Sequence, residues 1–304
     1  MLAIVIPYYK YTFFEATLES LANQTDKRFK VYIGDDGSPK HPLDLLEKYK
    51  DQFDFEYHRF ETNLGSVSLV QQWERCIDRT GTEQWIMILG DDDTLSLNCM
   101  SSFYDNLAEV EEQKINVIRY STVVIDQNET EISIVHKHPQ YEKSVDFLMR
   151  KSKGGTRSSL SEFIFKKEVL QEIRFKDLPL AWYSDILAVL EFSKFGLIYT
   201  INEAIVCFRL SGINITSKRD NLLLKNRATF KFYYYLINLK SKFFNRKERD
   251  VLMTMLEKTF FDNKKSIHFW VLFTKLYLSN LYFKKYSIFI GKMLKIILKK
   301  TNNT

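Results

Sequence analysis

The chain has few cysteines, glycines and prolines, and these shortages exclude several classes of protein. Its three cysteines, Cys76, Cys99 and Cys207, are widely spaced and contain no Cys-x-x-Cys pair. They predict neither a disulfide framework nor a zinc site, so a reducing compartment is expected. With 10 glycines and 5 prolines in 304 residues, long disordered linkers are not expected. A strand pattern begins at Leu2 without a basic leader, so no signal peptide is expected.

Acidic residues are scarce in the last part of the chain. Residues 221–304 contain 18 Lys and Arg against 4 Asp and Glu, a net charge of +14, whereas residues 1–220 contain 26 and 34, a net charge of −8. The overall charge of +6 hides this division. It predicts an acidic body followed by a basic region whose partner carries negative charge.

Apolar segments of two periodicities alternate through the first half of the chain. Short continuous runs indicate buried strands, and spacings of three and four indicate helices. This alternation predicts an α/β fold with a mostly parallel sheet. Ser66 is expected to cap the third helix. The expected strands are 2–6, 29–33, 53–60, 85–89, 115–125, 131–135, 160–165 and 197–210, the expected helices 13–22, 43–49, 66–79, 97–112 and 186–195, and a polar loop covers 151–156.

The strongest local signal is an apolar run, Trp85 to Leu89, that ends in Gly90 and three consecutive acids, Asp91, Asp92 and Asp93. Adjacent carboxylates repel one another, and burying them unpaired is unfavourable, so the run indicates a bound cation. Mg²⁺ and Mn²⁺ take such oxygen ligands and bridge to phosphates. A solvated acidic turn, or an Asp that caps the next helix, is the alternative.

Four motifs, each after an expected strand, together resemble the family 2 glycosyltransferases with the GT-A fold. They are Ile-Val-Ile-Pro-Tyr-Tyr at 4–9, Asp-Asp-Gly-Ser at 35–38, Asn-Leu-Gly at 63–65 and the triple Asp at 91–93. The resemblance covers about residues 1–215. It implies a Rossmann-like, mostly parallel sheet flanked by helices, a nucleotide-binding half over about 1–112, an acceptor half over about 113–220, and a helical extension over 221–304.

The resemblance assigns a nucleotide-sugar donor to the first half. It implies that Pro7 and Tyr9 line the nucleotide pocket, and that Asp36 accepts a hydrogen bond from the base with Asp35 beside it. The alternative for both acids is turn chemistry, because Asp-Gly pairs favour turns. Asn63 either contributes to the donor site or only forms a turn.

For the triple Asp, the resemblance implies a divalent Mn²⁺ or Mg²⁺ that bridges the acids and the donor diphosphate. Asp92 is then the closest ligand, Asp91 lies nearer the ribose, and Asp93 assists. Two departures stand out: many family members have Asp where this chain has Gly90, and the Arg-Asn pair often found after the Asn-Leu-Gly motif is missing from 66–72.

A sugar hydroxyl needs a base to remove its proton as the new bond forms. By resemblance that base is Asp185, at the start of an expected helix, and one base without a second nucleophile implies inversion. The alternative is helix capping by Ser184 or Asp185. Trp182 and Tyr183 either stack on a sugar or pack. Arg209 either approaches the diphosphate or is a sheet-edge arginine with a solvated head.

The basic region shows an amphipathic pattern at its end. Four lysines, at 285, 292, 295 and 299, fall on one helical face, and Phe289, Met293, Ile296 and Ile297 lie largely opposite. The pattern is typical of a helix that lies in an anionic membrane surface. Packing against the catalytic domain or a second subunit is the alternative. No uncharged apolar run reaches spanning length, and nucleic acid is not an expected partner.

The resulting hypothesis is an inverting, metal-dependent glycosyltransferase of surface-polysaccharide type. It moves a sugar, from a UDP-sugar, to a glycan or lipid-linked acceptor at the cytoplasmic face of the cell membrane, and a homo-oligomer is left open. Two other functions are weighed beside it. One is a non-catalytic glycan- or lipid-binding module of the same fold. The other is a nucleotidyltransferase, which usually has a Gly-rich phosphate loop that 7–10 lacks.

Overall fold

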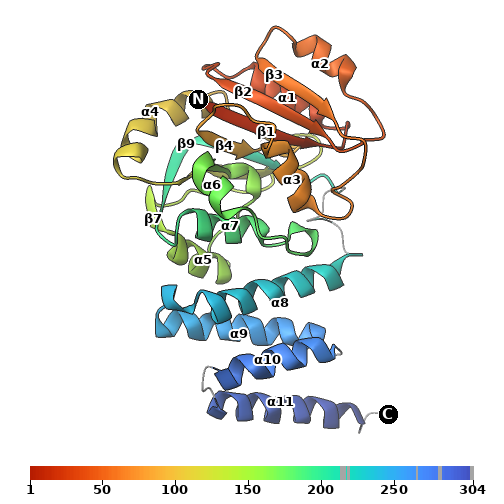
Figure 1. Ribbon diagram of the computed structural model, residues 1–304, viewed down its shortest axis with the longest axis vertical. Coiled ribbons are helices and arrows are strands. Elements are labelled where there is room, and N and C mark those ends of the chain that lie inside the picture. The colour runs from red at the N-terminus through yellow and green to blue at the C-terminus, as the bar shows by residue number, and fades with distance from the viewer. Residues whose placement is uncertain (213–216, 218–219, 265, 280–282, 302–304) are drawn as a thin grey trace. The chain divides into compact units, whose positions relative to one another are not determined.

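The computed structural model describes the chain apart from residues 213–216, 218–219, 265, 280–282 and 302–304 (Figure 1). The side chains of 262–263, 285 and 294–301 also lie outside the described part. The chain divides into two compact units, Met1–Asn221 and Leu222–Thr304. The boundary between the units in the sequence therefore falls where the net charge changes sign.

The described residues of the first unit form one mixed sheet with the order β3-β2-β1-β4-β8-β6-β9-β5, and β7 pairs with β9. Strands β1 to β4 run parallel to one another. Strand β8 is antiparallel to β4 and to β6. Strand β9 is parallel to β6 and antiparallel to both β5 and β7. The expected α/β class with a mostly parallel sheet is confirmed. The strands are β1 (Leu2–Tyr8), β2 (Phe29–Asp35), β3 (Asp54–Arg59), β4 (Trp85–Ile88), β5 (Thr94–Leu95), β6 (Val117–Ile125), β7 (Tyr141–Lys143), β8 (Phe163–Lys166) and β9 (Leu197–Arg209).

Helices bury the sheet, which explains why β1 and β4 read as continuous apolar runs. One face of β1, carrying Leu2, Ile4 and Ile6, belongs to a core that also contains residues of α1, α2 and α4. Helix α3 packs on β1 and β2 (Figure 1). The helices of this unit are α1 (Phe14–Ala22), α2 (Leu43–Tyr49), α3 (Leu69–Ile77), α4 (Cys99–Glu112), α5 (Ser144–Ser152), α6 (Lys167–Ile173) and α7 (Ser184–Phe192), with short 3-10 turns at η1 (Leu160–Glu162) and η2 (Pro179–Ala181).

Strand register brings three polar turns to one edge of the sheet. Tyr8 at the end of β1 pairs with Asp35 at the end of β2, and Val5 pairs with Ile88 at the end of β4. The turns that follow these parallel strands therefore meet at their carboxyl ends, where open α/β sheets bind ligands.

Helix α3 starts later than expected, and its cap is Ser68 rather than Ser66. The Ser68 hydroxyl accepts the N–H of Gln71 at 3.1 Å, whereas Ser66 donates its hydroxyl to the carbonyl of Asn63 at 2.8 Å. The expected cap at Ser66 is wrong because the preceding turn uses that hydroxyl.

Two expected strands in the second half are also corrected. Residues 131–135 form one isolated bridge with β6, between Glu131 and Ile125, and the Ser133 hydroxyl accepts the Val124 N–H at 2.9 Å in place of a main-chain carbonyl. Residues 160–162 form η1, closed by a capping box between Ser159 and Glu162, so β8 begins only at Phe163. Helices α5 and α6 were not expected from the sequence.

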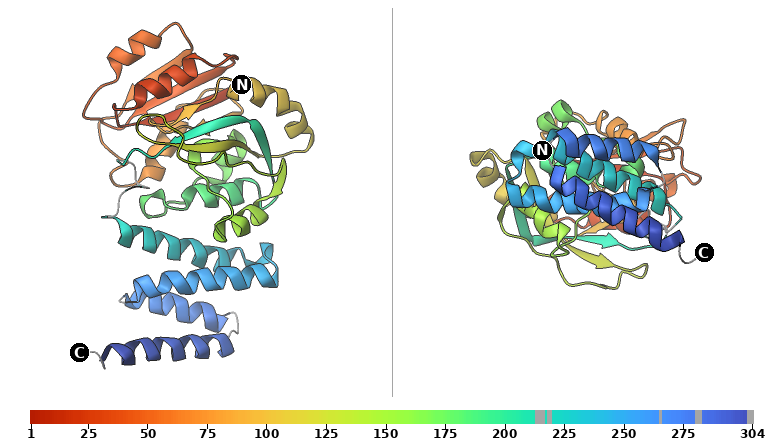
Figure 2. Two further views of the ribbon diagram at one scale, coloured as in Figure 1. Left: turned by 180° about the vertical axis from the view of Figure 1, so that it is seen from behind. Right: turned by 90° about the horizontal axis from the view of Figure 1, so that it is seen from below.

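The second unit is a stack of helices whose consecutive members run in opposite directions (Figure 2). They are α8 (Leu222–Leu239), η3 (Ser241–Phe243), α9 (Arg246–Asn263), α10 (Ile267–Ser279) and α11 (Phe283–Thr301). Aromatic rings fill the interior: Phe273 lies 4.7 Å from Phe260 and 4.5 Å from Phe289, measured between ring centroids. Among the described residues, no helix is long and apolar enough to cross a membrane.

The structure corrects the expected membrane face of α11. Phe289 and Met293, assigned to lipid, are buried, and Phe289 packs against rings of α9 and α10. Lys292, on the other side, is exposed. Ile296 and Ile297, and the lysines at 285, 295 and 299, have side chains outside the described part. The described part of the apolar face of α11 therefore packs within the unit.

Candidate active site

The turn after β4 is joined to the end of β1 by Asp91. Its Oδ2 accepts the main-chain N–H of Tyr9 at 2.8 Å and that of Lys10 at 2.6 Å. Asp91 thus lies at the carboxyl edge of the sheet, beside the Pro7–Tyr9 segment expected at the nucleotide. Pro7 is held in β1 by pairing with Gly34, while the side chain of Tyr9 is exposed.

Asp93 and Asp92 have very different surroundings. Asp93 accepts the main-chain N–H of Arg209 on Oδ1 at 2.9 Å and the Ser161 hydroxyl on Oδ2 at 2.6 Å. Asp92 accepts one long side-chain hydrogen bond, from the Ser211 hydroxyl at 3.3 Å. Protein donors therefore occupy both oxygens of Asp93, whereas Asp92 keeps an oxygen for another ligand.

Burial of the three acids makes their negative charge unfavourable. Burial, together with the adjacent negative charge of Asp92, raises the pKa of Asp91 to about 6 and that of Asp93 to about 7. Burial also raises the pKa of Asp92, although the positive charges of Lys10 and Arg209 oppose this shift. Lys10 is a cation at this edge of the sheet that was not predicted from the sequence. A carboxylate cluster with raised pKa values is an environment in which a cation is favourable.

Among the described residues, no group of three or more His, Cys, Asp or Glu side chains forms a metal cage. The residues present still fit Mg²⁺ or Mn²⁺, because such ions are often held by one carboxylate together with substrate phosphates and water. Asp92 supplies that carboxylate. Gly90 leaves space around it, since a Cβ at Gly90 would lie 3.3 Å from Asp92 Oδ1 and 3.1 Å from Asp93 Oδ2.

Asp35 is fully buried at the end of β2 and accepts three hydrogen bonds. They come from the N–H of Ser38 at 2.7 Å, the hydroxyl of Tyr57 at 2.6 Å and Nη1 of Arg59 at 2.8 Å. Burial raises the pKa of Asp35, but these donors outweigh it and hold the pKa below its ordinary value. Asp35 is therefore a fixed negative charge beside the end of β1.

Asp36 builds the turn that follows β3. Its carboxylate accepts the N–H of Leu64 at 2.7 Å and that of Gly65 at 2.9 Å, and it pairs with Arg75 at 2.5 Å. Asn63 lies in the same turn, where its Oδ1 accepts a backbone N–H three residues further on at 2.9 Å. Arg75, from α3, is an arginine beside this motif that was not predicted from the sequence.

Arg209 has a buried guanidinium, 1% exposed, rather than the solvated head that was one expectation. Its Nε donates to the carbonyl of Asp92 at 2.9 Å, and its Nη2 pairs with Glu129 at 2.8 Å. Together with the main-chain bond to Asp93, these contacts hold the acidic turn in position. The diphosphate contact expected of Arg209 stays a prediction.

Asp185 lines a cavity of about 390 Å³ at the start of α7. Burial raises the pKa of Asp185, while the positive charge of Lys151 opposes the shift. The residue in the cap position of α7 is Tyr183, which makes no side-chain cap bond, and Ser184 donates its hydroxyl to the carbonyl of Lys176 at 2.7 Å. Neither Ser184 nor Asp185 occupies the cap position. The cavity is lined by Leu69, Trp73, Lys151, Arg157, Ser158, Ser159, Leu160, Leu180, Ala181, Trp182, Tyr183, Asp185, Ile186 and Phe208.

The backbone before Asp185 is strained. Leu180, Ala181 and Tyr183 have φ angles of 60°, 52° and 70°. These values lie in the left-handed region, which residues other than glycine rarely adopt. Such outliers concentrate at ligand sites, where the surrounding structure holds them. Trp182 and Tyr183, with ring centroids 6.2 Å apart and nearly perpendicular, form one wall of the cavity beside Asp185.

The mixed sheet with acidic turns at its carboxyl edge matches the GT-A fold, and the chain is similar in fold to solved structures. The chain is similar to S. aureus TarS 1–349 in complex with UDP-GlcNAc, with a TM-score of 0.61 and 17% identity over 85% of this chain and 72% of that one. It covers 43% of the longer S. aureus TarS chain. GalNAc-T7 with UDP, GalNAc and Mn²⁺ matches with a TM-score of 0.54 and 12% identity, over 88% of this chain and 57% of that one.

The sequence itself identifies the family. The model of glycosyl transferase family 2 matches residues 3–174, and the chain belongs to this family. Comparison with curated protein sequences gave no match. At their low identities, the structural neighbours establish the fold of the chain and leave its substrates open.

Proposed function

We propose that the protein transfers a sugar from a nucleotide donor, a UDP-sugar, to a hydroxyl of a glycan or lipid-linked acceptor with inversion at the sugar. The observation that carries the proposal is the position of Asp185, which lines a cavity beside two aromatic rings and is not the cap residue of its helix. The family and the neighbours solved with UDP-GlcNAc or with UDP and GalNAc support the donor class.

In this proposal the donor lies along the carboxyl ends of β1, β2 and β4. Asp35 and Asp36 shape the base pocket with Pro7 and Tyr9, and Asp91 fixes the turn beside the ribose. A carboxylate has about four acceptor lone pairs. Asp36 can therefore accept a hydrogen bond from the base in addition to its bonds within the Asn63–Gly65 turn.

A divalent ion, when bound with the donor, neutralises the charge that develops on the leaving diphosphate. The residue that would hold it is Asp92. Asp93 and Arg209 keep the turn rigid, and Lys10 adds positive charge at the same edge. We do not assign Asp93 as a ligand, because Ser161 and Arg209 use its oxygens.

At the acceptor, Asp185 removes the proton of the attacking hydroxyl as the bond to the sugar forms. Trp182 and Tyr183 position the acceptor ring. Among the described residues that line this cavity, Asp185 is the single carboxylate, and one carboxylate acting as the base supports inversion.

The test is a screen of UDP-sugars for UDP release, with and without Mn²⁺, on the wild-type chain and the Asp185→Asn variant. We expect release with at least one donor and its loss in the variant, while UDP still binds to both. Equal turnover by the two proteins would overturn the role of Asp185. Binding without turnover on any acceptor would favour the non-catalytic module.

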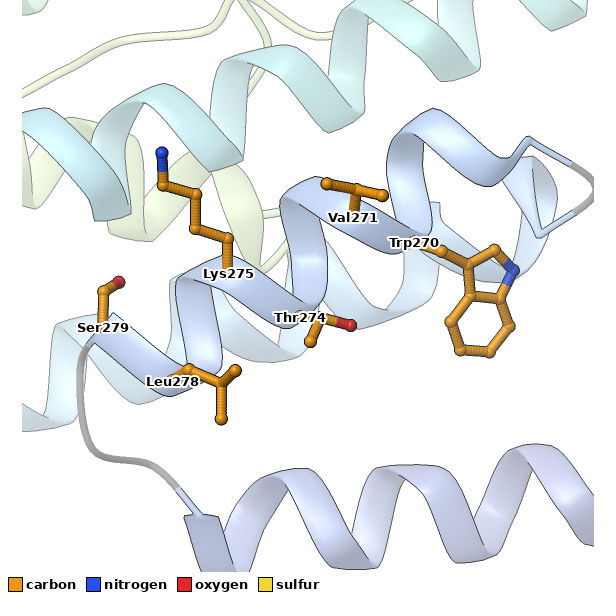
Figure 3. Close-up of a pocket in the computed structure, with 6 residues that line it drawn as sticks. All are labelled: Trp270, Val271, Thr274, Lys275, Leu278 and Ser279. Atoms are coloured by element: carbon orange, nitrogen blue, oxygen red, sulfur yellow. The ribbon is translucent and has the colours of Figure 1, made fainter.

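We also propose that the Leu222–Thr304 unit binds an anionic membrane surface, through α10 rather than α11. Ile267, Val271 and Leu278 follow one face of α10 and are 80%, 59% and 46% exposed. Val271 and Leu278 line a surface pocket of about 510 Å³ (Figure 3). An exposed apolar stripe on a unit of net charge +14 suits an anionic lipid surface.

A further inference from the structure

Two cationic side chains line the cavity beside Asp185 without a bonded counter-ion. Among the described residues, Arg157 and Lys151 make no side-chain hydrogen bond and no close ion pair, although both line the cavity. The guanidinium of Arg157 is held by stacking on the ring of Phe208, 4.3 Å from its centroid. Stacking on this ring therefore sets the orientation of the guanidinium, and its hydrogen-bond donors stay available to a ligand.

Three carboxylates lie within electrostatic reach of this pair, but none of them satisfies it. Glu162 is fully buried and does not line the cavity; its Oε2 accepts the N–H of Ser159 at 2.9 Å, and its Oε1 makes no hydrogen bond to either cation. Both carboxylate oxygens of Asp93 already accept hydrogen bonds, from the Ser161 hydroxyl and the Arg209 main-chain N–H. Asp185 lines the cavity with the two cations, so the lining itself carries one more positive than negative charge.

Unpaired donors are buried at this wall. Arg157 Nη1 and Ser158 Oγ are inaccessible to solvent and have no hydrogen-bond partner in the part of the chain that the structure describes. Buried polar groups in native proteins are nearly always paired, so each unpaired one calls for an explanation. Arginine and lysine only donate hydrogen bonds, so the missing partner is rich in acceptors and carries negative charge.

We infer that Lys151, Arg157 and Ser158 form a subsite for an anionic group, a phosphate or carboxylate, carried by the acceptor next to its attacking hydroxyl. This inference rests on the proposed transferase function, because it names the class of acceptor that the Asp185 cavity takes. The subsite binds the acceptor's charge while Asp185 removes a proton from the neighbouring hydroxyl.

The donor diphosphate offers the same chemistry from a second source. The remaining cavity lining favours the acceptor. Trp182, Tyr183 and Asp185 share the cavity with the two cations, whereas the acidic turn that would receive a diphosphate with its cation has its own positive charge in Lys10. An anion beside the base belongs to the molecule whose hydroxyl the base deprotonates.

The experiment titrates inorganic phosphate into the full chain by calorimetry, alone and with saturating UDP and Mg²⁺. We expect binding that persists with UDP present. It should weaken at least tenfold in Lys151→Met and in Arg157→Gln, and it should tighten in Asp185→Asn, which removes the neighbouring negative charge. Lys151→Arg keeps the charge and should retain binding. Lys153→Met is the matched control, because Lys153 is exposed two positions further on and does not line the cavity.

Three results overturn the inference. They are absence of phosphate binding, unchanged binding in Lys151→Met and Arg157→Gln, and competition between phosphate and UDP in the wild type, which assigns the cations to the donor. UDP titrations of the same variants separate this failure from that of the proposed function. If UDP binds while phosphate does not, only the acceptor subsite is wrong; if UDP does not bind, the donor assignment fails and phosphate alone still tests the subsite.

Discussion

The carboxylate of Asp93 accepts the main-chain N–H of Arg209 at 2.9 Å, across 116 positions of the sequence. The Arg209 side chain returns to the same turn, where Nε donates to the carbonyl of Asp92 at 2.9 Å. The end of β9 and the turn after β4 therefore hold each other. This reciprocal contact fixes the main chain of the turn that carries Asp92.

Arg209→Lys tests that contact. Lysine keeps the charge but lacks the planar fork that reaches Asp92, Asp126 and Glu129 together. We expect the free energy of unfolding to fall by about 1.5–3 kcal/mol, the range for hydrogen bonds made by a charged group, and donor affinity to fall with it. Urea denaturation measures the first effect. Arg28→Lys, at an exposed pair, should leave stability unchanged; equal stability of both variants would contradict the role of Arg209.

Asp185→Asn should reduce kcat by about 10²–10⁴-fold, the usual contribution of a general base, with little change in thermal stability or UDP affinity. The base works only when ionised. Since burial raises the pKa of Asp185, activity should be present above that raised pKa and lost as pH falls through it, starting at a higher pH than for an ordinary Asp. Lys151→Met removes an opposing charge and should move this acid limb to still higher pH. A limb at the same pH in wild type and Lys151→Met would contradict the assignment.

Gly65 is the position where the donor-side turn tolerates no side chain. A Cβ there would lie 2.5 Å from Asp36 Oδ2. Gly65→Ala must therefore displace the carboxylate from the main-chain N–H groups whose hydrogen bonds it accepts. We expect a loss of about 1–3 kcal/mol in unfolding free energy, the range for a buried unsatisfied group, together with weaker UDP binding. Gly291→Ala is the control, because a Cβ in that helix meets nothing within 4 Å and should stabilise by about 1 kcal/mol.

Asp92→Asn and Asp93→Asn should fail in different ways. If Asp92 holds the divalent ion, its variant should need at least about tenfold more Mn²⁺ or Mg²⁺ for half-maximal activity, since even indirect partners of a metal contribute that much. Asp93→Asn weakens the acceptor of Arg209 and Ser161, so unfolding free energy should fall with a smaller change in metal requirement. Metal titrations of UDP release measure the difference. A larger metal effect at Asp93 than at Asp92 would reverse the assignment.

The sequence predicted well which acids lie at the carboxyl edge of the sheet, because each acid directly follows its strand in the sequence. An apolar run followed by acids identifies a strand end, and parallel pairing then brings Asp35 and Asp91 to one edge. The partners of these acids were not predictable, because Arg75 reaches Asp36 and Ser161 reaches Asp93 only through packing between distant segments. Register offered one missed signal: Asp35 pairs with Arg59, so a strand ending at 60 brings that arginine to it.

Periodicity also misled where it could not identify the partner of a surface. Alternation over 131–135 resembled a strand, yet Ser133 gave β6 a side-chain oxygen in place of a main-chain carbonyl. The apolar face of α11 was assigned to lipid, but Phe289 packs on Phe273 within the helical unit. A helical repeat establishes that one face is apolar and does not say whether protein or membrane covers it.

The exposed face of α10 gives the remaining prediction. Vesicles with anionic lipid should carry the full chain in flotation, and a rise in salt from about 50 to 500 mM should release part of it by screening the basic unit. Val271→Glu should reduce flotation strongly, because it places a negative charge in the stripe of Ile267 and Leu278. Leu239→Glu makes the same change at a residue 61% exposed but outside the stripe, and should have little effect. If both variants float like the wild type while Val271→Glu converts a dimer to a monomer in light scattering, the stripe is a contact between two copies of the chain.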